Sequence, residues 1–247
     1  METSLRRIIL ISLLACLAVQ PASQARERKA PETVATGRVA SVVDGDTVRL
    51  DNGSQIRLTG IQAPKLPLGR HGFKAWPLSK ESKFALEKLT LHQQISLRYD
   101  GRKIDRHGRL LAHIFDSRGR WIQGEIISLG LARVYSFYDN RARTTDLLAL
   151  ERVARAARLG IWDHRFYRVL KSDETSGFID MFQLVEGRVM SAAIVRGRGY
   201  LNFGKNWRTD FTISISPRSH QSFKRAKIDI KSYVGRKLRV RGWLKSY

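Results

Sequence analysis

The fold is most constrained by three short segments, 38–43, 47–50 and 55–59, in which apolar and polar residues alternate. This period of two is typical of half-buried β-strands. The turn between the first two segments is Asp-Gly-Asp, and the Asp-Asn-Gly-Ser turn at 51–54 accepts positive φ, as tight hairpins require. On the third segment Ile56 and Leu58 would face the core, so Arg57 would lie on the face away from it.

The following residues add two strands and three helices. We expect a helix from Ser79, its N-cap, to about residue 91, and strands at 95–99 and 110–115. Two further helices are predicted at 123–129 and 145–159, each followed by a glycine stop. Five short strands with an intercalated helix predict a β-rich α+β fold, a small closed barrel of the OB kind with three helices, over residues 36–162.

A second β-rich unit is predicted at 183–247, after a charged linker at 163–182. Period-two patterns return at 185–195, 200–203, 211–215 and 238–244. We expect this unit to be OB-like as well. The sequence ends directly after the fourth strand, so the unit is either truncated or closes in another way.

The first 25 residues have the pattern of a signal peptide. Arg6 and Arg7 precede the apolar run 8–19, and small residues follow at 22–25. The run is shorter than the ~20 residues of a stable membrane span. We therefore expect export to the bacterial periplasm or secretion, with 26–35 as a flexible lead-in. Leu-Leu-Ala-Cys at 13–16 is similar to a lipoprotein box, which leaves a lipid anchor at Cys16, the only cysteine, as an alternative.

The charge balance indicates a polyanionic partner. Lys and Arg number 45 against 22 Asp and Glu, which gives a net charge of +23. The basic residues are spread along the chain, and such a field attracts nucleic acid first and anionic lipid or wall polymers second.

Four ordered motifs carry a family resemblance. They are Val-Asp-Gly-Asp-Thr-Val at 43–48, Ile-Arg-Leu-Thr-Gly-Ile at 56–61, Asp-Arg-His-Gly-Arg-Leu at 105–110 and Gly-Leu-Ala-Arg-Val at 130–134. In this order they resemble the thermonuclease, or staphylococcal-nuclease-like, family over residues 36–162. The segments at 200–204 and 207–211 resemble OB-type domains that follow the nuclease domain in some bacterial members.

The resemblance implies calcium-dependent hydrolysis of DNA or RNA phosphodiesters. By this resemblance Asp46 would be a calcium ligand, and Arg57 and Arg109 would bind the phosphate and stabilise the charge of the transition state. Arg suits this role because its planar fork matches phosphate oxygens and keeps its proton. Tyr138 matches a position where the family stacks an aromatic ring on a nucleotide.

The loop after the third strand departs from the family pattern at two positions. Gln62 stands where the family has a second calcium-binding carboxylate, and Lys65 replaces the glutamate that acts as general base or orients water. Calcium prefers six to eight oxygen ligands with carboxylate charge, so this loop disfavours it. The Lys65 ammonium could instead occupy the position of the cation and form a phosphate clamp with Arg57 and Arg109.

Three functions remain compatible with the sequence. The first is an exported protein that binds nucleic acid through this phosphate clamp and cleaves it slowly or not at all. The second is a working exported endonuclease with an altered metal site or a substitute base, which could be Lys65, His71, His107 or Glu81. The third is an envelope protein whose basic surface binds anionic polymers.

Overall fold

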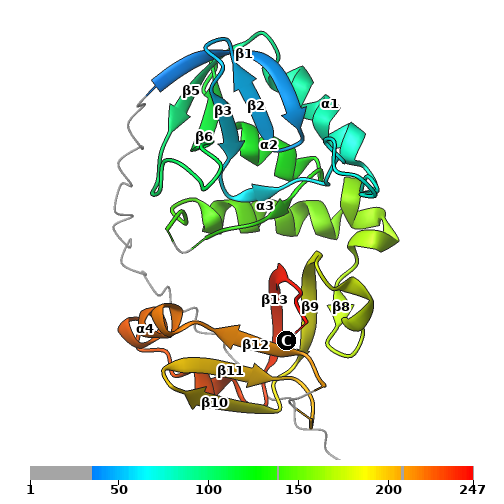
Figure 1. Cartoon of the computed structure of the whole chain (residues 1–247), viewed down its shortest axis with the longest axis vertical. Helices are drawn as coiled ribbons and strands as arrows, with labels where there is room; N and C mark the ends of the chain where they lie inside the picture. Colours follow the sequence, from blue (N-terminus) through cyan, green and yellow to red (C-terminus); the bar gives the residue numbers. More distant parts are fainter. Residues whose placement is uncertain (1–34, 138, 207–208, 247) are drawn as a thin grey trace, which may run out of the picture. The chain divides into compact units, whose positions relative to one another are not determined.

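The computed structural model describes residues 35–137, 139–206 and 209–246 (Figure 1). The predicted signal peptide, Cys16 and nearly all of the lead-in lie outside the described residues. So does Tyr138, the predicted stacking residue. None of the described helices is long and apolar enough to cross a membrane.

The N-terminal strands form the predicted barrel. It contains β1 (Ala35–Asp44), β2 (Thr47–Leu50), β3 (Gln55–Leu58), β5 (Gln94–Arg98) and β6 (Leu110–Asp116), closed in the order β1-β2-β3-β6-β5. β3 and β6 run parallel and the other neighbours antiparallel. The predicted five-stranded closed barrel is therefore confirmed. A short ladder of β4 (Ile61–Gln62) and β7 (Arg133–Val134) lies beside it.

Three helices complete this part of the chain: α1 (Ser79–Thr90), α2 (Ile122–Ser128) and α3 (Thr144–Ala156). One apolar core joins β3 to the three helices, and its completely buried residues include Ile56, Leu58, Leu86, Ile126 and Leu147. Ser79 is the first helical residue rather than the predicted N-cap; Leu78 takes the cap position with φ 61° and no side-chain cap.

The C-terminal strands form two three-stranded sheets. One has the order β10-β11-β12 (Ser191–Val195, Arg198–Asn202, Thr212–Ile215); the other is β13-β9-β8 (Lys237–Trp243, Phe182–Arg188, Leu170–Lys171). The predicted strand 185–195 is thus two strands in different sheets. Over the described residues these two sheets stay separate, so the expected second OB-like barrel is open. The proposed domain boundaries at 36–162, 163–182 and 183–247 stay predictions.

The sequence reading missed helix α4 (Pro217–Arg225). The sequence does contain a start signal, a serine at 216 followed by Pro217. In the structure the Ser216 hydroxyl caps the helix by accepting a hydrogen bond from Ser219 N. Its body is Arg-Ser-His-Gln-Ser-Phe-Lys-Arg, which has too few apolar residues to show a helical period.

An ion pair between the buried Glu151 and the partly exposed Arg241 joins α3 to β13. Both carboxylate oxygens of Glu151 accept from the Arg241 guanidinium, at 2.9 and 2.7 Å, and Oε1 also accepts from Val134 N at 2.8 Å. Close by, the guanidinium of buried Arg133 lies 4.9 Å from the Phe182 ring and 5.1 Å from the Tyr167 ring. Burial lowers the pKa of Arg133 to about 10.

Arg241→Ala is expected to lower the free energy of unfolding by about 3 kcal/mol, because it leaves the buried Glu151 charge without its partner. Denaturant unfolding of purified variants measures this loss. Lys245→Ala is the control, since its ion pair with Asp180 is exposed and should contribute about 1 kcal/mol or less. Equal losses in the two variants would contradict the importance assigned to the Arg241 pair.

Candidate phosphate-binding cleft

A cleft of about 450 Å³ opens where the loops that follow β3 meet two other loops, 102–109 and 135–140. Its lining includes five basic and two acidic residues: Arg57, Lys65, Arg102, Arg106, Arg109, Asp105 and Asp139. The excess of positive charge in a concave site favours a polyanion.

Asp46 lies fully buried beneath this cleft, in the turn between β1 and β2. Its Oδ2 accepts a hydrogen bond from Ala63 N at 2.8 Å, and its Oδ1 accepts one from the Thr47 hydroxyl at 3.2 Å. The turn itself is fixed by Asp44, whose Oδ1 accepts from Asp46 N at 3.1 Å. The acidic turn thus has both the local role expected of Asx residues and a carboxylate directed at the 62–65 loop.

Lys65 supplies the cation that faces both carboxylates. Its Nζ lies 3.1 Å from Asp46 Oδ2, 3.4 Å from Asp46 Oδ1 and 3.9 Å from Asp44 Oδ2. The ammonium is partly exposed to the cleft, whereas the two carboxylates are covered. A side-chain cation therefore neutralises the acidic turn.

Arg57 is buried, contrary to the expectation that it lies on a face away from the core. Only 8% of the residue is exposed. Its guanidinium donates to Leu58 O at 2.6 Å and Ile61 O at 2.8 Å, and lies 3.2 Å from Asp46 Oδ2. The alternation correctly places it outside the apolar core, but the loop after β3 folds back over it. Backbone carbonyl groups then accept hydrogen bonds from its guanidinium. Arg57 still lines the cleft.

Arg109 is the more accessible arginine. Its Nε donates to Asp105 Oδ2 at 2.8 Å, and its Nη2 lies 2.7 Å from the same oxygen. Asp105 Oδ1 also accepts the backbone N–H groups of His107 and Arg109, which shapes the loop. Arg109 is thereby held at the cleft wall.

The two carboxyl groups of the acidic turn have opposite pKa shifts. Burial raises the pKa of Asp46, but the charges of Arg57 and Lys65 and the N–H of Ala63 outweigh it and hold this pKa well below its ordinary value. Burial, together with the charge of Asp46, raises the pKa of Asp44. Asp46 is therefore the anion that the two cations neutralise.

This donor set does not fit a calcium ion. Gln62 turns its amide nitrogen toward Asp46 Oδ2, 3.4 Å away, and so presents a donor where a ligand oxygen would be needed. The Asp46 carboxylate is already paired with two cations. Within the described part of the chain, no group of three or more His, Cys, Asp and Glu side chains is arranged to hold a metal ion.

The structure brings four predicted residues together: Arg57, Lys65 and Arg109 line the cleft, and Asp46 lies beneath it. Tyr138 lies outside the described residues, and its neighbours Phe137 and Asp139 line the cleft. The sequence reading missed Arg102, Arg106, Tyr135, Phe137 and Asn140. Asn140 links two walls, because its Oδ1 accepts from Arg102 N at 2.8 Å and its Nδ2 donates to Arg102 O at 3.0 Å. The basic composition of 102–109 is a sequence signal for Arg102 and Arg106, whereas Tyr135, Phe137 and Asn140 have no comparable signal.

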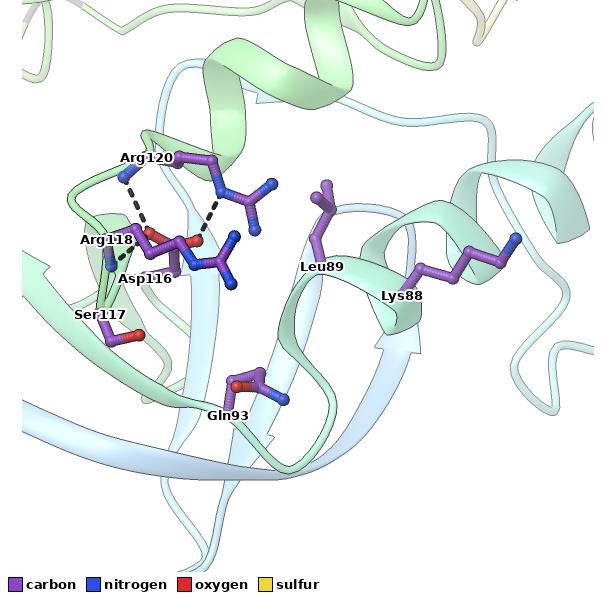
Figure 2. A pocket seen from close by; sticks show the side chains of 7 residues that line it. All are labelled: Lys88, Leu89, Gln93, Asp116, Ser117, Arg118 and Arg120. Atoms are coloured by element: carbon purple, nitrogen blue, oxygen red, sulfur yellow. Dashed lines mark hydrogen bonds and ion pairs between the residues drawn. The ribbon is translucent and has the colours of Figure 1, made fainter.

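A second cavity, of about 270 Å³, lies elsewhere on the barrel and has a different construction (Figure 2). The Asp116 carboxylate at its wall accepts from the backbone N–H groups of Arg118 and Arg120 and from Arg120 Nε. Asp116 therefore organises its own turn. None of the predicted site residues lines this cavity, whose basic residues include Arg118.

The barrel and the ordered motifs define a nuclease-type OB fold, and the chain belongs to the staphylococcal nuclease homologue family, whose model matches residues 55–164. The chain is 30% identical over 149 residues to an uncharacterized protein of Methanocaldococcus jannaschii, covering 51% of this chain and 71% of that protein. It is 26% identical over 132 residues to the thermonuclease of Staphylococcus hyicus, covering 52% and 76%. An uncharacterized endonuclease of Escherichia coli is 29% identical over 131 residues, covering 51% and 76%.

Proposed function

We propose that this protein is exported and binds DNA or RNA by gripping backbone phosphates with Lys65, Arg57 and Arg109, without a calcium ion. The observation that carries the proposal is the Lys65 Nζ 3.1 Å from Asp46, in the position where the acidic turn would otherwise offer its charge to a metal. The net positive cleft lining supports a phosphate partner. The leader-like pattern at 1–25 supports action in the periplasm or outside the cell, with a lipid anchor at Cys16 as the alternative.

The cations have different parts in this mechanism. Arg109 and the outer side of Lys65 reach the cleft and contact phosphate oxygens, Arg109 through its planar guanidinium. Arg57 mainly fixes the loop and adds charge from below, since its donors are shared with Leu58 O and Ile61 O. Protonated Lys65 has no free electron pair to take a proton from water, so the cleft binds phosphate better than it activates water.

Phosphodiester hydrolysis is the second candidate function, favoured by the family assignment and by the thermonuclease and endonuclease relatives. His107 lines the cleft and its Nε2 accepts from Arg106 Nε at 3.1 Å. If this imidazole serves as base, cleavage persists with chelator and is lost in His107→Gln. Cleavage assays with and without chelator separate this candidate from binding alone.

Arg109→Ala is expected to weaken binding of a short DNA duplex about tenfold at low salt and to reduce the slope of log K against log salt by about one. Fluorescence anisotropy titrations at several salt concentrations measure both quantities. Arg118→Ala removes the same charge at the second cavity and should change the affinity less than threefold. Equal weakening by the two variants would show diffuse attraction to the basic surface and contradict a specific cleft.

A further inference from the structure

The strands β10, β11 and β12 form a three-stranded sheet (Figure 1), one face of which packs on a hydrophobic core. Leu201 and Ile215 are buried in the core cluster beneath it. Alternation along β11 therefore places Arg198, Tyr200 and Asn202 on the outward face. Arg198 is exposed and the other two are partly exposed.

The neighbours of Tyr200 on this face are small. Its cross-strand partners are Ala193 on β10 and Ser214 on β12. With an alanine and a serine at its sides, the ring of Tyr200 is the large apolar surface at the centre of the sheet. Because both neighbouring side chains are small, the Tyr200 ring has space for a planar group to stack on it.

Polar side chains around Tyr200 are fixed by hydrogen bonds across the strands. Asn202 Nδ2 donates to the Ser191 hydroxyl at 2.9 Å, and the Thr212 hydroxyl donates to Asn202 Oδ1 at 3.1 Å. On the other side Arg198 Nη1 donates to the Ser214 hydroxyl at 3.0 Å. The face thus combines cross-linked polar side chains with one aromatic ring, one guanidinium and the exposed side chain of Val195, which pairs with Arg198.

The structure also distinguishes among the aromatic residues of this unit. Phe203 is buried and packs against Phe211, with ring centroids 5.1 Å apart, so it belongs to the core. Trp207 lies outside the described residues. Among the described residues of this sheet, Tyr200 is the aromatic residue that faces outward.

The surrounding charge is strongly positive. Residues 183–247 contain 15 Lys and Arg against three Asp and Glu. Glu186, one of the three acids, is already paired with Lys237 and Arg239. The nearest basic residues in sequence to Tyr200 are Arg196, Arg198 and Lys205, all exposed. A polyanion is therefore the partner whose charge complements this unit.

We propose that the outward face of β10-β11-β12 is a second nucleic-acid-binding surface, which stacks an unpaired base on Tyr200 and holds the adjoining phosphates with Arg198 and its basic neighbours. Single-stranded nucleic acid is the expected ligand, because a base must be unpaired to lie on the ring. The inference rests on the proposed function only in taking nucleic acid as the polyanion. The surface gives the protein a preference for single strands that a phosphate cleft alone does not provide.

The test is anisotropy titration of the full chain with a labelled single-stranded oligothymidylate and with a duplex of equal length. Tyr200→Leu keeps apolar bulk but removes the aromatic face, and should weaken single-strand binding about tenfold while changing duplex binding less than twofold. Tyr200→Phe should bind like the wild type. Phe84→Leu is the control, since Phe84 is an exposed aromatic on α1 far along the chain from this sheet.

Unchanged single-strand binding by Tyr200→Leu, or an equal loss with both ligands, would overturn the proposal. Binding to anionic vesicles that depends on Tyr200, with no dependence for the oligonucleotide, would overturn it in favour of a membrane partner. If the leucine variant fails to fold, photocrosslinking of an iodouracil oligonucleotide to the wild type should map to Tyr200, and a map that omits Tyr200 rejects the surface. Arg109→Ala, titrated in parallel, judges the cleft separately.

Discussion

The double variant Gln62→Asp with Lys65→Glu is expected to bind calcium, whereas the wild type should not respond to it. The change removes the ammonium that lies 3.1 Å from Asp46 Oδ2 and adds two carboxylates beside the acidic turn. Four carboxylates would then face one region, with Arg57 as the remaining buried counterion. Such a cluster is repulsive when empty and favours a hard divalent cation, which prefers charged oxygen ligands.

Calcium at about 100 times its Kd should stabilise this variant by about 2.7 kcal/mol. For a chain of this size the increase in Tm is about 5–10 °C, relative to the same variant with chelator. Differential scanning calorimetry with calcium and with chelator measures the shift. If nuclease chemistry is restored as well, DNA cleavage should appear with calcium and vanish with chelator.

The matched control is Gln221→Asp with Lys224→Glu on α4. It makes the same chemical changes at the same three-residue spacing, on exposed positions outside the cleft. This control should show no calcium-dependent shift. A wild-type protein that gains as much Tm with calcium as the double variant would show that Lys65 does not replace the ion.

Asp46→Asn is expected to lower the free energy of unfolding by about 3–5 kcal/mol. The substitution leaves the Arg57 guanidinium and the Lys65 ammonium without their common buried partner, and an uncompensated buried charge is costly. Ala63 N would also lose a charged acceptor. Chemical denaturation at neutral pH measures the difference.

Asp163→Asn is the control for this prediction, because Asp163 pairs with Arg158 on the surface and both side chains are mostly exposed. This variant should lose about 1 kcal/mol or less of unfolding free energy.

The difference in unfolding free energy between the wild type and Asp46→Asn should also depend on pH. The pKa of Asp46 is lower in the folded than in the unfolded protein, so its contribution is complete above the unfolded pKa of about 4 and is lost as the pH falls. A pH-independent difference would contradict the ion-pair explanation.

Much of the barrel could be predicted because its signals are local. The strand that carries Ile56 and Leu58 alternates, and the Asn-Gly turn before it accepts the positive φ that Gly53 shows, 83°. The motif at 105–110 likewise locates Arg109 at a loop, where Asp105 fixes it through neighbours in sequence. Short-range patterns of this kind involve residues that are close in sequence, so they can be recognised without knowing which distant segments meet.

The fold class, the family and the two replacements in the loop after β3, Gln62 for a carboxylate and Lys65 for a glutamate, could be recognised from the residues alone. The positions of the charged groups relative to one another depend on the folded structure. Asp46 and Lys65 are 19 residues apart and meet because the barrel closes β3 against β2, and Arg57 is buried because the next loop folds back over it. Alternation gives the face of a strand but not what covers that face. The same limit applied to Phe203 and Tyr200, whose separation into core and surface depends on the sheet that packs around them.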